Sequence, residues 1–370
     1  MVPLRFCVSS PKDERLEHLP TAGPIFLIAE FSPGGVMRPG GLEYCGLQPD
    51  RLSCGPVCAP WKATSMFSGL SAFPITPAGA DGKIDIRAFS RLVERLVQAK
   101  VDSIGILGST GSYPYLARGQ RRKAVEAARE VSGGKVPLLV GCGALRTDDT
   151  IDLAKDAEAA GADALLLAPV SYLPLLDDEV FVHFETVAAA TKLPLCIYNN
   201  PGTTHFTVSS ALLARLAEIP NVVAVKNPAP AAADVAAYHR SAAEVVDPDF
   251  SLGYSGDWNA TEALITGGRA WYSVAGGLFP RPCLRIARAV QAGDVETARR
   301  LNAGLEPLWA LFRKYSSYRV VHAAARGLGL ADSYPPRPIL PLSSKAEQEI
   351  LDVLASLGLA GGHSGMEAAK

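Results

Sequence analysis

The 370-residue sequence has almost no excess of charge: 36 Lys and Arg residues stand against 37 Asp and Glu residues, and the formal net charge is −1. It also has no cluster of basic residues and no basic stretch interleaved with aromatic ones. Proteins that bind a phosphate backbone or an anionic membrane surface carry such clusters. We therefore expect neither nucleic acid nor a membrane as a partner.

Long hydrophobic runs are missing as well. No apolar stretch approaches the roughly 18 residues that a membrane-spanning helix needs, and the first residues lack the apolar core of a secretory signal. Hydrophobic residues nevertheless make up 48% of the chain, enough for a sizeable core. We expect a cytoplasmic protein.

Cysteine pairs at metal-binding spacing are absent too. Cys54 and Cys58 have no second Cys or His pair nearby that would complete a zinc site. Three later cysteines, Cys142, Cys196 and Cys283, each stand alone in or beside apolar segments, where a buried free thiol is the usual state. We expect no metal and no cofactor.

The composition and the hydrophobic pattern of the chain change at Met66. Residues 1–65 are rich in Pro, Gly and Cys and show no sustained period. We expect them to be a disordered extension or a start assigned too far upstream; a targeting or regulatory segment is the alternative. We assign 66–293 to a barrel and 361–370 to a loose tail. Additional helices are expected within 294–360, at about 294–313, 316–329 and 344–357.

Short aliphatic runs alternate with amphipathic ones after Met66. The expected strands are Gly69–Phe73, Ser103–Leu107, Leu138–Gly141, Ala164–Ala168, Leu195–Tyr198, Val222–Lys226, Phe250–Gly253 and Ala270–Val274. The expected helices include Ile86–Ala99, Gly119–Val131, Thr150–Ala160, Glu179–Thr191, Ser209–Ile219 and Ala260–Thr266. Fully apolar strands that alternate with helices indicate an α/β fold, a (β/α)8 TIM barrel with a C-terminal helical extension. An open doubly wound sheet is the alternative, but it would carry a GxGxxG turn after an early strand, and none occurs there.

Active sites of such barrels lie where the strands end. Lys226 ends an apolar strand, and no acidic residue lies between Glu218 and Asp234 to pair with it locally. Three other lysines precede strands and fall at the opposite face: Lys100, Lys135 and Lys192. A surface lysine with a distant carboxylate partner is the alternative.

A lysine amine in this position suggests covalent chemistry. A free lysine is almost wholly protonated at neutral pH, but apolar surroundings favour the neutral amine, which attacks ketones. The resulting imine stabilises an enamine at the neighbouring carbon. Lys226 therefore suggests an aldolase that needs no metal.

Two further strand ends carry polar groups. Tyr198 ends the strand before that of Lys226, close enough for its phenol to move protons, although a lone tyrosine is more often a packed residue. The turn 108–112 places two hydroxyls, Ser109 and Thr110, among small residues. Such a turn suits a substrate carboxylate, but alone it is only a turn.

Four spaced motifs carry a family resemblance. They are GSTG at 108–111, YNNPGT at 198–203 with AVKN at 224–227, YSGD at 254–257 and GGRAWYSV at 267–274. Together they resemble the dihydrodipicolinate synthase/N-acetylneuraminate lyase family of class I Schiff-base aldolases and lyases. The resemblance spans roughly residues 66–330.

The resemblance implies a role for each matching residue. Lys226 would form the Schiff base with pyruvate or a related 2-oxo acid, and Tyr198 would donate and accept protons. Ser109 and Thr110 would bind the substrate carboxylate, with Ser109 also in the place of a proton-relay threonine. Tyr272 would lie near the pyruvyl group through its backbone. The family also implies a homo-oligomer, a tetramer built as a dimer of dimers.

Several positions depart from the family pattern. Thr203 stands where synthases of the lysine pathway have an arginine for the second substrate's carboxylate, and Ser112 replaces the glutamate of the GTTGE signature. Ser171 aligns with a tyrosine contributed across the dimer, which Tyr172 could replace after a shift of one residue. Gly256 is a possible further site residue. These departures favour a 2-oxo-3-deoxy sugar acid or a 4-hydroxy-2-oxo acid over aspartate semialdehyde; dihydrodipicolinate synthesis is the alternative, and a dehydratase a further one.

Two other classes of function compete with this hypothesis. A metal-dependent aldolase needs a cluster of His, Asp and Glu, but the six histidines are scattered, and only His205 follows a strand end near the site. A barrel without catalytic activity that binds a 2-oxo acid or a protein would not need an amine at a strand end.

Overall fold

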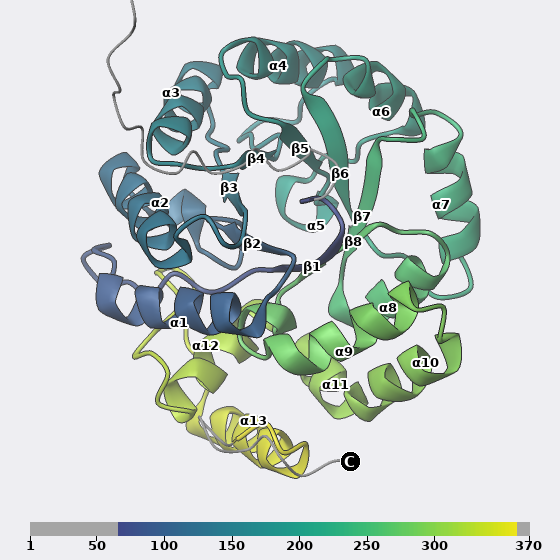
Figure 1. Ribbon diagram of the computed structural model, residues 1–370. Coiled ribbons are helices and arrows are strands. Elements are labelled where there is room, and N and C mark those ends of the chain that lie inside the picture. Colours follow the sequence, from purple (N-terminus) through teal and green to yellow (C-terminus); the bar gives the residue numbers. More distant parts are fainter. Residues whose placement is uncertain (1–65, 361–370) are drawn as a thin grey trace, which may run out of the picture. The chain divides into compact units, whose positions relative to one another are not determined.

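The computed structural model describes residues 66–360; the predictions for residues 1–65 and 361–370 lie outside that range. Eight parallel strands close into a barrel in chain order, with β8 paired to β1 (Figure 1). The strands are β1 (Gly69–Ala72), β2 (Ser103–Ile106), β3 (Leu138–Gly141), β4 (Ala164–Leu167), β5 (Leu195–Tyr198), β6 (Val222–Pro228), β7 (Ser251–Ser255) and β8 (Ala270–Ser273). The predicted TIM barrel is confirmed.

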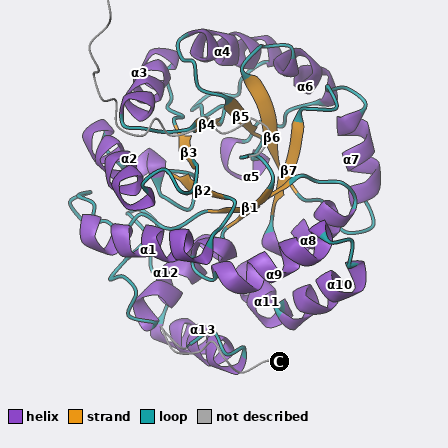
Figure 2. Ribbon diagram, in the orientation of Figure 1, coloured by secondary structure: helices purple, strands orange, loops and turns teal. Residues whose placement is uncertain are grey.

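A ring of helices surrounds the strands (Figure 2). It consists of α1 (Ile86–Ala99), α2 (Arg118–Ser132), α3 (Thr147–Ala159), α4 (Asp177–Ala189), α6 (Ser210–Ala217), α7 (Val235–Ala243), α8 (Asp257–Ile265) and α9 (Pro280–Gln291). The short α5 (Pro201–Thr204) lies between β5 and α6. None of the helices described between residues 66 and 360 is both long and apolar enough to span a membrane.

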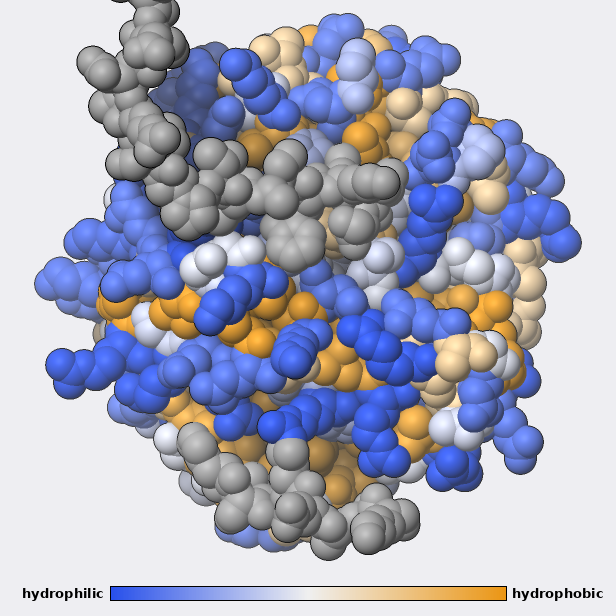
Figure 3. Space-filling view, viewed as in Figure 1, coloured by the Kyte–Doolittle hydropathy of each residue, from blue (hydrophilic) through white to orange (hydrophobic). Residues whose placement is uncertain are grey.

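Helix α1 shows why these segments fold locally. Asp85 precedes it and accepts a hydrogen bond from the backbone N–H of Ala88, which satisfies one of the free donors of the first turn. Phe89, Leu92 and Leu96 recur on one face and are buried. The apolar face packs inward and the polar face remains in water, as a helical period predicts. On the face in view, hydrophilic residues cover much of the surface, with hydrophobic residues showing in patches between them (Figure 3).

The barrel interior has its own core. Its buried apolar residues are Met66, Phe67, Phe73, Leu139, Ala164, Leu166, Ala168, Cys196, Tyr198, Ala224, Ala270 and Tyr272. Two glycines make room for the largest rings. A Cβ added to Gly105 would lie 2.2 Å from the ring of Phe73, and one added to Gly253 would lie 2.4 Å from the ring of Tyr272. Both distances are far below van der Waals contact, so these rings depend on the missing side chains.

Four helices follow the barrel: α10 (Val295–Gly304), α11 (Glu306–Tyr315), α12 (Ser317–Gly327) and α13 (Ser344–Ser356). The single helix predicted at 294–313 is wrong, because the chain breaks at Leu305 between α10 and α11. Pro307 explains the break: it has no N–H to continue the helical hydrogen bonds, and it is tolerated in a first turn.

Candidate active site

A cavity of about 630 Å³ lies at the carboxyl ends of the strands. Residues from the loops after β2, β4, β5, β6, β7 and β8 line it, together with the start of α12. Seven residues singled out from the sequence meet there: Ser109, Thr110, Tyr198, Thr203, Lys226, Gly256 and Tyr272. The cavity falls within the size range of small-molecule sites.

Lys226 lies at the base of this cavity with only 5% of its surface exposed. Its Nζ atom is 4.0 Å from the ring centre of Phe73, 4.1 Å from that of Tyr198 and 5.7 Å from that of Tyr272. No residue between 66 and 360 forms a hydrogen bond or an ion pair with this Nζ atom. The amine therefore faces aromatic rings at distances typical of cation–π contacts.

Asp257, the first residue of α8, is the one carboxylate that lines the cavity in the described part of the chain. It accepts hydrogen bonds of 2.8 Å from the indole N–H of Trp271 and from the backbone N–H of Ala275. Burial raises the pKa of Asp257, although these bonds and the charge of Lys226 act against that rise. Both carboxylate oxygens of Asp257 therefore already accept hydrogen bonds from the protein.

Tyr198 is the direct neighbour of Lys226, since the two are register partners on β5 and β6. Its hydroxyl lies 3.2 Å from the Oγ of Ser109 and accepts a 2.9 Å hydrogen bond from the side-chain amide of Asn200. Because Asn200 donates, the Tyr198 hydroxyl can give its own proton to Ser109 or to a substrate. Asn200 belongs to the YNNPGT motif, but the motif alone does not reveal this contact.

A pair of buried asparagines holds the two strand ends together. The side-chain amide of Asn199 donates a 2.9 Å hydrogen bond to the side-chain oxygen of Asn227. The oxygen of Asn199 accepts one of 3.2 Å from the backbone of Val208. The residues that follow Tyr198 and Lys226 thereby fix the spacing of those two side chains.

The turn after β2 folds back on itself. Leu107 and Ser112 adopt positive φ angles of 55° and 56°, and a Cβ at Gly111 would approach the backbone nitrogen of Leu107 to 2.9 Å. Thr110 is buried and lines the cavity. Ser112, which replaces the signature glutamate, lies with its Oγ 2.6 Å from the hydroxyl of Tyr318 on α12.

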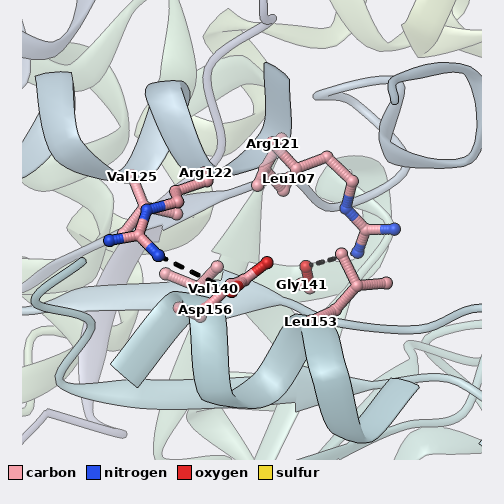
Figure 4. A pocket seen from close by; sticks show the side chains of 9 residues that line it. Leu107, Arg121, Arg122, Val125, Val140, Gly141, Leu153 and Asp156 are labelled. Atoms are coloured by element: carbon pink, nitrogen blue, oxygen red, sulfur yellow. Dashed lines mark hydrogen bonds and ion pairs between the residues drawn. The ribbon is translucent and has the colours of Figure 1, made fainter. Parts of the chain in front are cut away.

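Arg121 supports this side of the cavity from outside its lining, and Figure 4 shows its hydrogen bond to Gly141. It is buried and donates hydrogen bonds of 2.9 and 3.1 Å to the carbonyl oxygens of Gly141 and Gly143 at the end of β3. Its guanidinium lies 5.2 Å from the ring centre of Tyr113, a cavity-lining residue. A separate cavity of about 10 Å³, lined in part by Arg121, has room for about one water molecule and is too small for a substrate.

Two other titratable groups under the cavity are neutral at physiological pH. Burial raises the pKa of Tyr272 well above its usual value and that of the Cys196 thiol to about 12. The Tyr272 hydroxyl lies 3.5 Å from the Sγ of Cys196, and its ring packs edge-on against Phe73. These groups shape the wall beside Lys226 and do not supply a nucleophile.

Of the remaining predicted residues, Thr203 and Gly256 line the cavity and Tyr172 does not. Thr203 lines the cavity and donates to the backbone oxygen of Asn200 at 3.2 Å, and Gly256 lines it with a positive φ of 88°. Tyr172 does not reach the cavity of its own chain and is 91% exposed. Val170 takes the lining position in that loop.

Among residues 66–360 no three His, Cys, Asp or Glu side chains come together as a potential metal site. His205 is exposed and does not line the cavity.

Comparison with known proteins agrees with this geometry. The model of the dihydrodipicolinate synthetase family matches residues 66–357. The 4-hydroxy-tetrahydrodipicolinate synthase of Acidiphilium cryptum is 32% identical over 295 residues, covering 80% of this chain and 99% of the relative. That of Hyphomonas neptunium is 34% identical over 296 residues, with the same coverage. The crystal structure of a dihydrodipicolinate synthase from Agrobacterium tumefaciens matches with a TM-score of 0.79 and 56% identity, covering 80% of this chain and all of that one.

Proposed function

Since this chain belongs to the dihydrodipicolinate synthetase family of lysine-dependent lyases, we propose that Lys226 is its Schiff-base lysine and Tyr198 its proton carrier. The chain is a class I lyase or aldolase that acts on pyruvate or a related 2-oxo acid. One observation carries the residue assignment: a buried amine without an ion-pair partner among residues 66–360 lies directly beside Tyr198 at the strand ends.

The amine of Lys226 adds to the ketone carbon of the 2-oxo acid to give a carbinolamine, and loss of water leaves an imine. The protonated imine draws electrons from the adjacent carbon. In cleavage, the C4 hydroxyl loses its proton, the C3–C4 bond breaks and an aldehyde leaves, so that an enamine remains. Protonation of the enamine at C3 and hydrolysis of the imine then release pyruvate and the free amine. In synthesis the enamine attacks an aldehyde instead.

Tyr198 can serve both proton transfers. It protonates the departing carbinolamine hydroxyl, and as a phenolate it accepts the proton of the C4 hydroxyl. The hydrogen bond from Asn200 stabilises that phenolate. Ser109 lies within reach to pass the proton on, in the place of the family's relay threonine.

Ser109 and Thr110 are the proposed site of the 2-oxo acid carboxylate. Both line the cavity, and their hydroxyls and backbone N–H groups are suitable donors. Tyr272 also lines the cavity, and its backbone is the proposed contact to the pyruvyl group.

The other reactant or product of the reaction is an aldehyde. The positions at which this chain departs from the family pattern limit which aldehyde it can be. With Thr203 in the place of an arginine, we propose a 2-oxo-3-deoxy sugar acid or a 4-hydroxy-2-oxo acid as substrate. The alternative is 4-hydroxy-tetrahydrodipicolinate synthase, the name that the curated relatives carry. A panel of 2-oxo-3-deoxygluconate, 4-hydroxy-2-oxoglutarate, sialic acid, and pyruvate with aspartate semialdehyde discriminates between them.

Reductive trapping tests the central assignment. We expect borohydride with pyruvate to add a stable mass to the peptide containing Lys226, because hydride converts the imine to a secondary amine. The variant Lys226→Ala should take up no adduct, and EDTA should leave trapping unchanged. An unmodified Lys226 peptide at saturating pyruvate would refute the assignment.

We also propose that the chain assembles as a homo-oligomer. The loop after β4 exposes Tyr172, Leu173 and Leu176 to 91%, 68% and 70%, and the neighbouring loop exposes Leu145 to 66%. Grouped apolar side chains of this kind mark protein interfaces, and a second copy would bring Tyr172 into contact with protein. Analytical ultracentrifugation measures the state, and a monomer at micromolar concentration would refute this proposal. A cytoplasmic location remains our proposal.

A further inference from the structure

The cavity above Lys226 is lined by a second cationic side chain, Arg319 of α12. Arg319 is half-buried. No residue described between 66 and 360 forms a hydrogen bond or an ion pair with its guanidinium. By contrast, the guanidinium of Arg121 donates to two backbone oxygens. A guanidinium that has no partner in this part of the chain and lines a cavity is a candidate to bind a ligand.

The contacts of Tyr318 position this arginine. The hydroxyl of Tyr318 lies 2.6 Å from the Oγ of Ser112 in the loop after β2. Its ring packs on His322, with ring centres 4.8 Å apart. The contact with Ser112 fixes the first turn of α12 at the barrel mouth. The position of the adjacent Arg319 in the cavity wall is fixed with it.

Within residues 66–360, no carboxylate forms an ion pair with Arg319. In the proposed reaction Lys226 becomes a protonated imine beside the first carboxylate of the substrate. Asp257 already accepts hydrogen bonds from Trp271 and Ala275. Thr203 is neutral. A second anionic group on the substrate would balance the charge of Arg319.

We propose that Arg319 binds a second carboxylate at the far end of the 2-oxo acid, and that this enzyme prefers 2-oxo dicarboxylates. The inference rests on the proposed function, because it takes the imine at Lys226 as the other end of the substrate. A cavity of about 630 Å³ holds such a molecule with room to spare. An amino aldehyde fits less well, because Asp257 is the sole lining carboxylate among residues 66–360 and is already engaged.

Two ligands of equal length test the proposal: 2-oxoglutarate and 2-oxopentanoate differ only in the far carboxylate. By titration calorimetry we expect the unaltered full-length protein to bind 2-oxoglutarate about 10- to 100-fold more tightly, the range for one charged hydrogen bond. Arg319→Leu should abolish this preference, and Arg319→Lys should keep part of it. Arg91→Leu, which removes an exposed arginine of α1, is the control and should retain it fully.

A preference that persists in Arg319→Leu, or that is absent from the unaltered protein, would overturn the role of Arg319. Pyruvate trapping in the same variants keeps the two proposals apart. An adduct at Lys226 without a dicarboxylate preference refutes the arginine site alone. A missing adduct refutes the Schiff-base assignment, and the calorimetric preference then still decides whether Arg319 binds the second carboxylate.

Discussion

Acid should weaken the fold through His322, a residue of α12. His322 is 1% exposed, and its Nδ1 lies 2.9 Å from the Oγ of Ser333. Its Nε2 has no hydrogen-bond partner among the described residues. Burial, aided by the charge of Arg326, lowers the pKa of His322 from 6.5 to about 4.

The direction of the effect follows from proton binding. Below pH 6.5 the unfolded chain takes up a proton at His322 and the folded chain does not, so this contribution to stability is complete above pH 6.5. It declines as the pH falls and is lost near pH 4. The gap between 6.5 and about 4, at about 1.4 kcal/mol for each pH unit, amounts to about 3 kcal/mol.

Urea unfolding followed by circular dichroism between pH 7.5 and 4.5 measures this contribution. We expect the free energy of unfolding to fall more steeply for the unaltered protein than for His322→Asn, whose amide can still pair with Ser333. The difference should approach the full 3 kcal/mol only near pH 4, the order of magnitude given by the shift. His205→Asn, at an exposed position, should behave as the unaltered protein. Parallel curves for the unaltered protein and His322→Asn would show that His322 does not contribute to the acid sensitivity.

Two further predictions concern the site itself. Tyr198→Phe should reduce kcat by about 10²- to 10⁴-fold with little change in pyruvate binding, because it removes a general acid and base; an unchanged kcat would exclude its role as proton carrier. Gly253→Ala should impair pyruvate trapping and lower the melting temperature, because its Cβ would lie 2.4 Å from the ring of Tyr272 beside Lys226. The exposed Gly119, whose added Cβ would meet nothing within 4 Å, supplies the control Gly119→Ala; equal effects of the two substitutions would contradict this account.

The sequence predicted the barrel and the pairing of its two principal residues because both follow from local patterns. Apolar runs specify strands, and a reactive side chain at the end of a run must lie at the barrel mouth. Lys226 and Tyr198 are therefore found as expected, in direct register. The strand ends differ from the prediction by one or two residues, as for β6, which continues to Pro228.

Contacts between segments far apart in the chain could not be predicted, because local sequence patterns do not specify how the segments pack. Phe73 lies against Lys226 only because Gly105, a residue of another strand, leaves its ring space. Nothing in the first turn of α12 distinguishes Arg319 in the sequence, because its place at the cavity results from how α12 packs on the barrel. The turn after β4 leaves Tyr172 facing outward, where only a partner could cover it.

The start of α12 forms one wall of the cavity although this helix lies outside the eightfold strand–helix repeat. In the roles that we propose, the covalent step belongs to Lys226 of the barrel and the recognition of the far carboxylate to Arg319 of α12. We therefore expect mutations at the start of α12 to alter which substrates bind while the amine of Lys226 stays in place. The appended helices thus offer a second place, besides the barrel loop with Thr203, where specificity can diverge without a change at Lys226.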